Sequence, residues 1–66
     1  MNKKLQEIRR RKKITQIDLA RKLGVNRSYI SKIENDERQL SLEGFLNYCK
    51  ALEEDPVQLI KSVFGL

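Results

Sequence analysis

The chain has little of the chemistry on which many small proteins depend. Its 66 residues include no histidine, no tryptophan, one cysteine and one proline. Because Cys49 is alone, an intrachain disulfide is excluded, and without histidine there is no credible zinc cluster and no imidazole base. A nucleophile with a partner base, a metal-ligand set or a phosphate-binding glycine loop cannot be assembled. An enzyme is therefore the least supported class, and we expect no metal and no other cofactor.

Long hydrophobic runs are lacking too. No apolar stretch approaches the roughly 20 residues of a membrane span, and the opening segment, MNKKLQEIRRRKK, is too charged for a signal peptide. We therefore expect a cytoplasmic protein without a membrane contact. With 66 residues, of which 39% are hydrophobic, the chain has room for one small domain, residues 1–66, and none for a small-molecule effector pocket.

Charge of the two signs is distributed unevenly along the chain. Residues 1–33 hold eleven basic and two acidic residues, a net charge of +9, whereas residues 34–66 hold three basic and seven acidic residues, a net charge of −4. A polyanion would attract the first half and repel the second. This separation indicates a protein that approaches nucleic acid in a preferred orientation. The run RRRKK by itself is equally consistent with a solvated helix end.

Apolar spacing and capping residues predict helices throughout the chain. Residues that can cap a helix precede four of the expected helices: Thr15, Asn26, Ser41 and Asp55. Gly24 suits the left-handed conformation that ends a helix. We predict an all-α, compact five-helix bundle with helices at residues 2–12, 16–23, 27–34 or 35, 42–52 and 56–63.

Two predicted helices are rich in large apolar residues. In the helix at residues 42–52, the spacing predicts a core-facing stripe of Leu42, Phe45, Leu46, Cys49 and Leu52. The last helix, residues 56–64 at its longest, carries Leu59, Ile60, Val63 and Phe64. Some of these should complete the core, and the others are predicted to form the two-fold interface of a homodimer. The alternative is a monomer whose tail folds back on itself.

The helices on either side of Gly24 predict a helix-turn-helix over residues 16–35. Ala20 is small enough to let the two helices cross closely, and the second helix has a polar outward face. A recognition helix contacts base edges in the major groove through its N-terminal part. Arg27, Ser28 and Lys32 are therefore predicted to contact bases, and the alternative is that they are ordinary exposed polar residues.

These residues resemble a known family. The stretch LQEIRRRKKITQIDLARKLGVNRSYISKIEN is similar to the helix-turn-helix of the Cro and phage-repressor type, also called the xenobiotic-response-element family. SLEGFLNYCKALEEDPVQLI is similar to the fourth and fifth helices of that family. The resemblance implies a lambda-repressor-like domain that binds double-stranded operator DNA, usually as a dimer, and controls transcription. We expect a repressor.

The resemblance also implies roles for single residues. Gln16 matches a phosphate-binding glutamine of the family, and the start of a helix suits an anion. Glu34 is expected to pair with Arg9 and so to orient the recognition helix. Independently of the resemblance, Asn35 can adopt the left-handed conformation and cap this helix. Further candidates for contacts with the DNA backbone are Arg10, Thr15, Tyr29, Ser31, Asn35 and Arg38.

One departure from the family pattern affects the loop after residue 35. The family often continues IEN with glycine and a basic residue, whereas this chain has Asp36 and Glu37. These carboxylates would lie near an expected phosphate contact and leave Arg38 as the cation of the loop.

Two other functions use the same bundle. One is a protein-interaction module, such as an antitoxin or a phage accessory protein, and the other is a restriction-modification controller protein, which also binds DNA. The basic first half and the polar face of residues 27–34 favour DNA as the partner.

Overall fold

The computed structural model describes residues 2–65, and the side chains of Asn2, Val63 and Phe64 lie outside this description. Within residues 2–65 there are five helices and no strand, which confirms the predicted all-α fold. The helices are α1 (Asn2–Arg11), α2 (Gln16–Leu23), α3 (Arg27–Glu34), α4 (Leu42–Leu52) and α5 (Pro56–Phe64). The predicted bounds differ from the observed ones by one residue at most. None of the helices in this part of the chain is long and apolar enough to cross a membrane.

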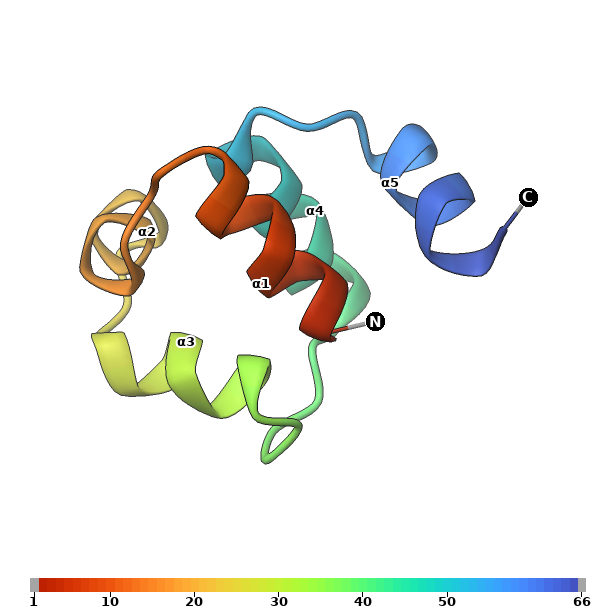
Figure 1. Cartoon of the computed structure of the whole chain (residues 1–66). Coiled ribbons are helices and arrows are strands. Elements are labelled where there is room, and N and C mark those ends of the chain that lie inside the picture. Colours follow the sequence, from red (N-terminus) through yellow and green to blue (C-terminus); the bar gives the residue numbers. More distant parts are fainter. Residues whose placement is uncertain (1, 66) are drawn as a thin grey trace.

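The helices enclose one hydrophobic core. α2 packs against both α3 and α4, α1 packs against α3, and α5 packs against α4. In Figure 1, α2 and α3 therefore lie on the side of the molecule opposite α5. The buried apolar residues of the core come from all five helices: Leu5, Ile8, Leu19, Ala20, Ile30, Ile33, Phe45, Tyr48, Cys49, Leu52 and Leu59.

Side chains cap four of the helices as predicted. The Thr15 hydroxyl accepts a hydrogen bond from the Asp18 amide at 3.0 Å, and the Ser41 hydroxyl accepts one from the Gly44 amide at 3.0 Å. The Asn26 side-chain oxygen accepts from a backbone amide at the start of α3, and the Asp55 carboxylate does so at the start of α5. Each cap satisfies a backbone donor that a helix start would otherwise leave unpaired.

Several helices end at or near a residue in the left-handed conformation, with a positive φ. Gly24 has a φ of 70°, as predicted, and the residue after it donates a backbone hydrogen bond across the turn to Ala20. The same left-handed position is held by residues other than glycine after α1, α3 and α4, namely Lys13, Asp36 and Glu53. An L-residue in this conformation is strained by roughly 1–2 kcal/mol, so three of these four ends are less than optimal.

Asn35 caps the C-terminal end of α3, as predicted, but the prediction that it can do so in the left-handed conformation is wrong. Its φ is −92°, and the residue with a φ of 60° is Asp36. The Asn35 amide still donates to the Ser31 carbonyl at 3.0 Å, so α3 hydrogen bonding continues through Asn35. The reversal of the chain therefore falls one residue later than expected.

The predicted core stripe of α4 is correct in part. Phe45, Cys49 and Leu52 are buried, and burial raises the pKa of the Cys49 thiol, as expected for a core residue rather than a reactive one. Leu42 and Leu46 are instead 72% and 46% exposed. The predicted stripe left out Tyr48, which is fully buried. Its large ring lies between Phe45 and Leu52 along the helix, so the buried face is centred there and the two leucines fall outside it.

Of the residues on α5 predicted to form a dimer interface, Leu59 belongs to the core instead. Leu59 is only 2% exposed and belongs to the core of the single chain, so its surface is not available to a partner. Ile60 is 36% exposed, and Val57, one turn earlier, is 58% exposed. The other two predicted interface side chains, of Val63 and Phe64, lie outside the described residues.

Candidate nucleic-acid interface

Helix α3 has one buried and one polar face. Ile30 and Ile33 are fully buried, because they pack into the core beneath the helix. Arg27, Ser28 and Lys32 are exposed at the first, second and sixth positions of α3, where the sequence predicted contacts with bases. The three side chains predicted to contact bases thus lie on a helix that the core holds in place.

A buried ion pair joins α1 to α3, as expected. Arg9 Nε donates to Glu34 Oε2 at 2.6 Å and Arg9 Nη2 donates to Glu34 Oε1 at 3.0 Å, while Arg9 Nη1 donates to the Ile14 carbonyl at 2.8 Å. The two charged side chains are only 7% and 1% exposed. This bidentate pair fixes the orientation of α3 relative to α1 and to the segment that leads into α2.

The electrostatics of this pair favour an ionised Glu34. Burial by itself would raise the pKa of its carboxyl group. The hydrogen bonds from Arg9 and Gln16, together with the positive charge of Arg9, outweigh burial and hold the pKa below its ordinary value. Glu34 is therefore a carboxylate that accepts hydrogen bonds from both α1 and α2.

Gln16 extends this pair to the protein surface. Its Nε2 donates to Glu34 Oε1 at 2.9 Å, and its Oε1 accepts from Arg27 Nε at 3.2 Å. The Glu34 carboxylate can only accept a hydrogen bond and the Arg27 guanidinium can only donate one. These two neighbours therefore determine which way the Gln16 side-chain amide is oriented. Both Nη groups of Arg27 lie outside this hydrogen-bonded chain and are available for a bidentate contact.

One side of α3 brings together several predicted contacts with the DNA backbone. A shallow concavity of about 390 Å³ is lined by Arg9, Arg10, Thr15, Gln16, Ile17 and Arg27. Only one of the two amide hydrogens of Gln16 is needed for Glu34, so the second can reach a phosphate, as the family resemblance implies. The Thr15 hydroxyl accepts the capping bond of α2, which confirms its capping role.

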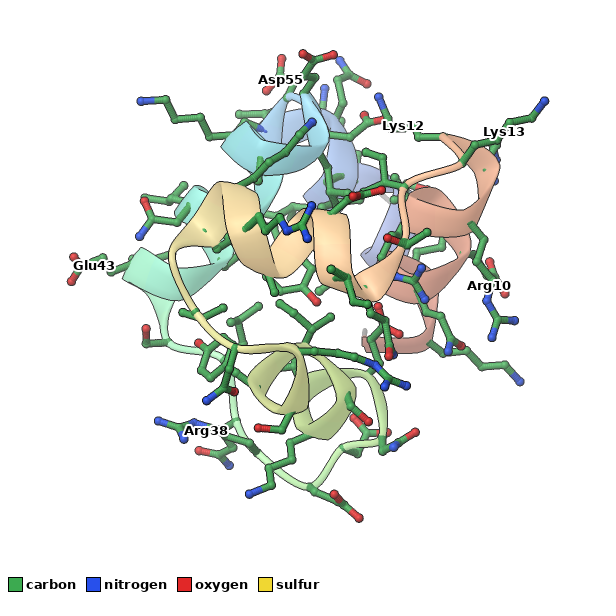
Figure 2. The ribbon with its side chains drawn as sticks, turned by 90° about the vertical axis from the view of Figure 1, so that its left-hand side faces the viewer. Arg10, Lys12, Lys13, Arg38, Glu43 and Asp55 are labelled. Carbon is green, nitrogen blue, oxygen red and sulfur yellow. The ribbon has the colours of Figure 1, made fainter. Side chains whose placement is uncertain are left out.

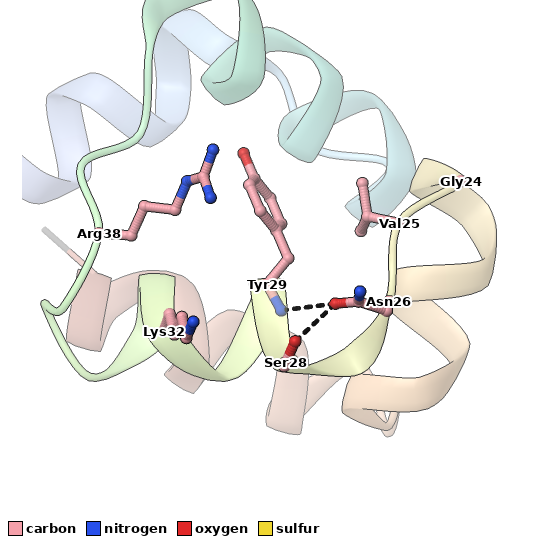
Figure 3. A pocket seen from close by; sticks show the side chains of 7 residues that line it. All are labelled: Gly24, Val25, Asn26, Ser28, Tyr29, Lys32 and Arg38. Atoms are coloured by element: carbon pink, nitrogen blue, oxygen red, sulfur yellow. Dashed lines mark hydrogen bonds between the residues drawn. The ribbon is translucent and has the colours of Figure 1, made fainter.

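A second concavity, of about 490 Å³, lies on the other side of α3 (Figure 3). The Arg38 guanidinium lies over the face of the Tyr29 ring, with its central carbon 5.0 Å from the ring centre, which is a cation–π arrangement. Tyr29 is half-buried and packs against the core. The concavity is lined by Gly24, Val25, Asn26, Ser28, Tyr29, Lys32 and Arg38.

The exposed face of α3 itself forms the third concavity, of about 430 Å³, lined by Arg27, Ser28, Ser31, Lys32 and Glu37. Ser31 is half-buried and its hydroxyl accepts from Asn35 Nδ2 at 3.4 Å. Glu37 lies beside the predicted base-contacting residues, so the departure noted in the sequence brings a carboxylate to this face. Figure 2 shows Arg10 and Arg38 at opposite edges of the surface formed by α2 and α3.

Sequence reasoning missed two features of this surface. It treated Asn26 only as a cap, although the residue also lines the second concavity and binds the Ser28 hydroxyl. It also did not connect Gln16 with Arg27. The available signal was position, because Asn26 immediately precedes α3 and Gln16 begins the helix that α3 crosses.

Three features define a helix-turn-helix DNA-binding domain. Two helices, α2 and α3, are joined by a turn at Gly24; α3 has a polar outward face; and the buried Arg9–Glu34 ion pair holds that face in position. The chain belongs to the helix-turn-helix family of the Cro and phage-repressor type, since the helix-turn-helix family model matches residues 5–59. The protein is accordingly a DNA-binding transcriptional regulator.

Among solved structures, the restriction-modification controller protein C.AhdI from Aeromonas hydrophila is similar to this chain. The two share 34% sequence identity and superpose with a TM-score of 0.81, over 88% of this chain and 84% of that chain. No curated protein sequence matches the chain.

Proposed function

We propose that the protein binds a specific double-stranded DNA operator through α3, as a homodimer on an inverted repeat, and represses transcription there. One observation carries this proposal: the hydrogen-bonded chain that leads from the buried Glu34 through Gln16 to Arg27. Side chains held in position beforehand lose less conformational entropy on binding, so they discriminate between bases more sharply. A merely solvated polar face would not need such support from the core.

The chemistry of the exposed side chains suggests the contacts. Arg27 and Lys32 can only donate hydrogen bonds, so guanine, with its O6 and N7 acceptors, is their preferred partner in the major groove. Around them, the predicted contacts with sugar and phosphate fix the position of the protein on the duplex. The residues with this proposed role are Arg10, Thr15, Gln16, Tyr29, Ser31, Asn35 and Arg38.

Exposed apolar side chains on α4 and α5 support the proposed homodimer. Val57 and Ile60 on α5 are exposed, as are Leu42 and Leu46 on α4. A homodimer on an inverted repeat requires its two copies of α3 to lie about 34 Å apart, in successive major grooves. We propose that exposed apolar side chains of this set form the two-fold interface. Sedimentation of the wild-type chain and of the Ile60→Asp variant tests this, because a charge at a dimer interface should shift the equilibrium toward the monomer.

Selection of binding sites from random duplex DNA by the purified protein tests the whole proposal. Enrichment of an inverted repeat with half-sites centred about 10 base pairs apart is the expected result. Failure to enrich any motif at moderate salt would contradict the proposal, leave only non-specific attraction to phosphate, and favour a protein partner, as for an antitoxin or phage accessory protein.

The likeness to C.AhdI favours a more particular role, that of a restriction-modification controller protein. A chain of this role would regulate genes for a restriction enzyme. The selected operator should then occur upstream of such genes near the gene for this chain. An operator found only at unrelated genes would contradict this role and leave the general regulator in place.

A further inference from the structure

Hydrogen bonds at the start of α3 fix the direction in which the Ser28 hydroxyl points its proton. Ser28 Oγ lies 2.7 Å from Asn26 Oδ1, and the Tyr29 backbone amide lies 3.2 Å from the same oxygen (Figure 3). The Ser28 hydroxyl and the Tyr29 amide therefore hydrogen-bond to the same atom of the capping Asn26 side chain.

The capping bond decides which atom of Asn26 this is. A backbone N–H can only donate, so the atom that faces the Tyr29 amide must be the amide oxygen and not the nitrogen. A carbonyl oxygen can only accept, so Ser28 must be the donor of the 2.7 Å bond. A hydroxyl has one proton, and its use here leaves Ser28 with lone pairs that can only accept.

We propose that Ser28 contacts an exocyclic amino group in the major groove, either N6 of adenine or N4 of cytosine, and discriminates against the acceptor edges of guanine and thymine. The inference rests on the proposed function, since it requires α3 in the major groove. Ser28 is exposed and lines two of the three concavities around α3, so a base can approach it. The amino groups of these two bases are the donors that the major groove offers.

Ser28 differs from its neighbours on α3 in the kind of hydrogen bond that it can make with a base. Arg27 precedes it and Lys32 lies one turn beyond it, and both can only donate. Ser28 thus places an acceptor between two donors along the recognition face. The expected half-site contains guanines opposite Arg27 and Lys32 and an adenine or cytosine opposite Ser28.

The test compares the wild-type protein with Ser28→Ala on every single base-pair change of the selected operator. Ser28→Ala should lose discrimination at one position, where the wild type prefers adenine or cytosine. Replacing that base with purine or with 2-pyrimidinone, each of which lacks the amino group, should weaken the wild type about tenfold and leave Ser28→Ala unaffected. The two analogues distinguish adenine from cytosine.

Asn26 provides a second variant and a matched control. Asn26→Gly removes the acceptor of the Ser28 proton, while glycine remains an acceptable residue at the cap position. Guanine or thymine should then become acceptable at the Ser28 position. Asn26→Asp retains an acceptor oxygen and should retain the preference, whatever its effect on overall affinity.

Three results would overturn the inference. A Ser28-dependent preference for guanine or thymine would show that the hydroxyl donates to DNA, and an unchanged profile for Ser28→Ala would show that the residue contacts no base. If the wild-type protein enriches no operator at all, the proposed function fails together with the inference, and this outcome is recognised before any variant is made.

Discussion

Arg9 on α1 and Glu34 on α3 form a doubly hydrogen-bonded ion pair that is almost completely removed from solvent. Removing one member of a buried pair leaves the other charge without its main partner. We expect Arg9→Met, which retains much of the side-chain volume, to lower the free energy of unfolding by about 3–5 kcal/mol in urea denaturation.

A matched control for Arg9→Met exists on the same helix. Lys4 and Glu7 are 4.0 Å apart with side chains 34% and 53% exposed, so Lys4→Met should change stability by less than about 1 kcal/mol. Similar losses in the two variants would mean that the buried pair has no special role.

The lowered pKa of Glu34 predicts a dependence of stability on pH. A carboxyl group whose pKa is lower in the folded than in the unfolded state adds stability above its unfolded pKa, and this stability is lost as the pH falls through the folded pKa. The ordinary value is 4.5, so the wild-type free energy of unfolding should decline as the pH is lowered from about 5 toward 3. Glu34→Gln cannot ionise and should decline less steeply. Parallel declines would assign the effect to other carboxylates.

Because Gln16 holds Arg27, the two residues should act together in DNA binding. Arg27→Ala should weaken operator binding by about 1–3 kcal/mol and relax preference at one base. Gln16→Ala should weaken all sequences and, because it also releases Arg27, reduce the preference at that base to a smaller extent. A double-mutant cycle on the operator should give a coupling energy of at least about 0.5 kcal/mol. Gln16 paired with Arg38, on the other side of α3, is the control and should show additivity. Equal loss of preference from both single substitutions would contradict these roles.

The Tyr48 hydroxyl predicts a stabilising substitution. It is buried and is without a hydrogen-bond partner in the described part of the chain, and burial and the negative charge of Glu34 raise its pKa, so it remains protonated. A buried polar group left unpaired costs roughly 1–3 kcal/mol. We expect Tyr48→Phe to raise the melting temperature. Tyr29→Phe changes the same atom on a half-buried ring and should not do so. A clear loss of stability in Tyr48→Phe would contradict this reasoning.

Glu53 offers a test of backbone strain. It ends α4 with a φ of 59° and is exposed. Glu53→Gly should stabilise the protein by up to about 1 kcal/mol, because relief of the left-handed strain exceeds the added entropy of glycine in the unfolded chain. Glu53→Ala keeps the strain and serves as the control in thermal unfolding. An equal effect of the two substitutions would rule out strain as the cause.

Local signals in the sequence were sufficient for the helices and the turn. Thr15, Asn26, Ser41 and Asp55 cap helices as expected because capping depends on a few neighbouring atoms. The same holds for Gly24, whose conformation follows from its lack of a side chain. Such features could be predicted without knowledge of the packing.

The errors arose where tertiary packing decides between neighbouring positions. The buried face of α4 depends on how α2 and α5 press against it, and periodicity alone could not rank Tyr48 above Leu46. The hydrogen bond from Arg27 to Gln16 joins two helices whose crossing geometry sets the distance. The resemblance to a family supplied the Arg9–Glu34 pair, but it could not indicate how that pair reaches the protein surface.

The carboxylate of Glu37, which lines the recognition face beside Arg27 and Lys32, has a consequence for how the protein searches a genome. Its negative charge repels the phosphates of every duplex equally, whatever the sequence. Contacts with the right bases can offset this repulsion, whereas attraction to an arbitrary stretch of DNA is weakened by it. The protein should therefore dissociate sooner from wrong sites and spend a larger share of its time at its operator.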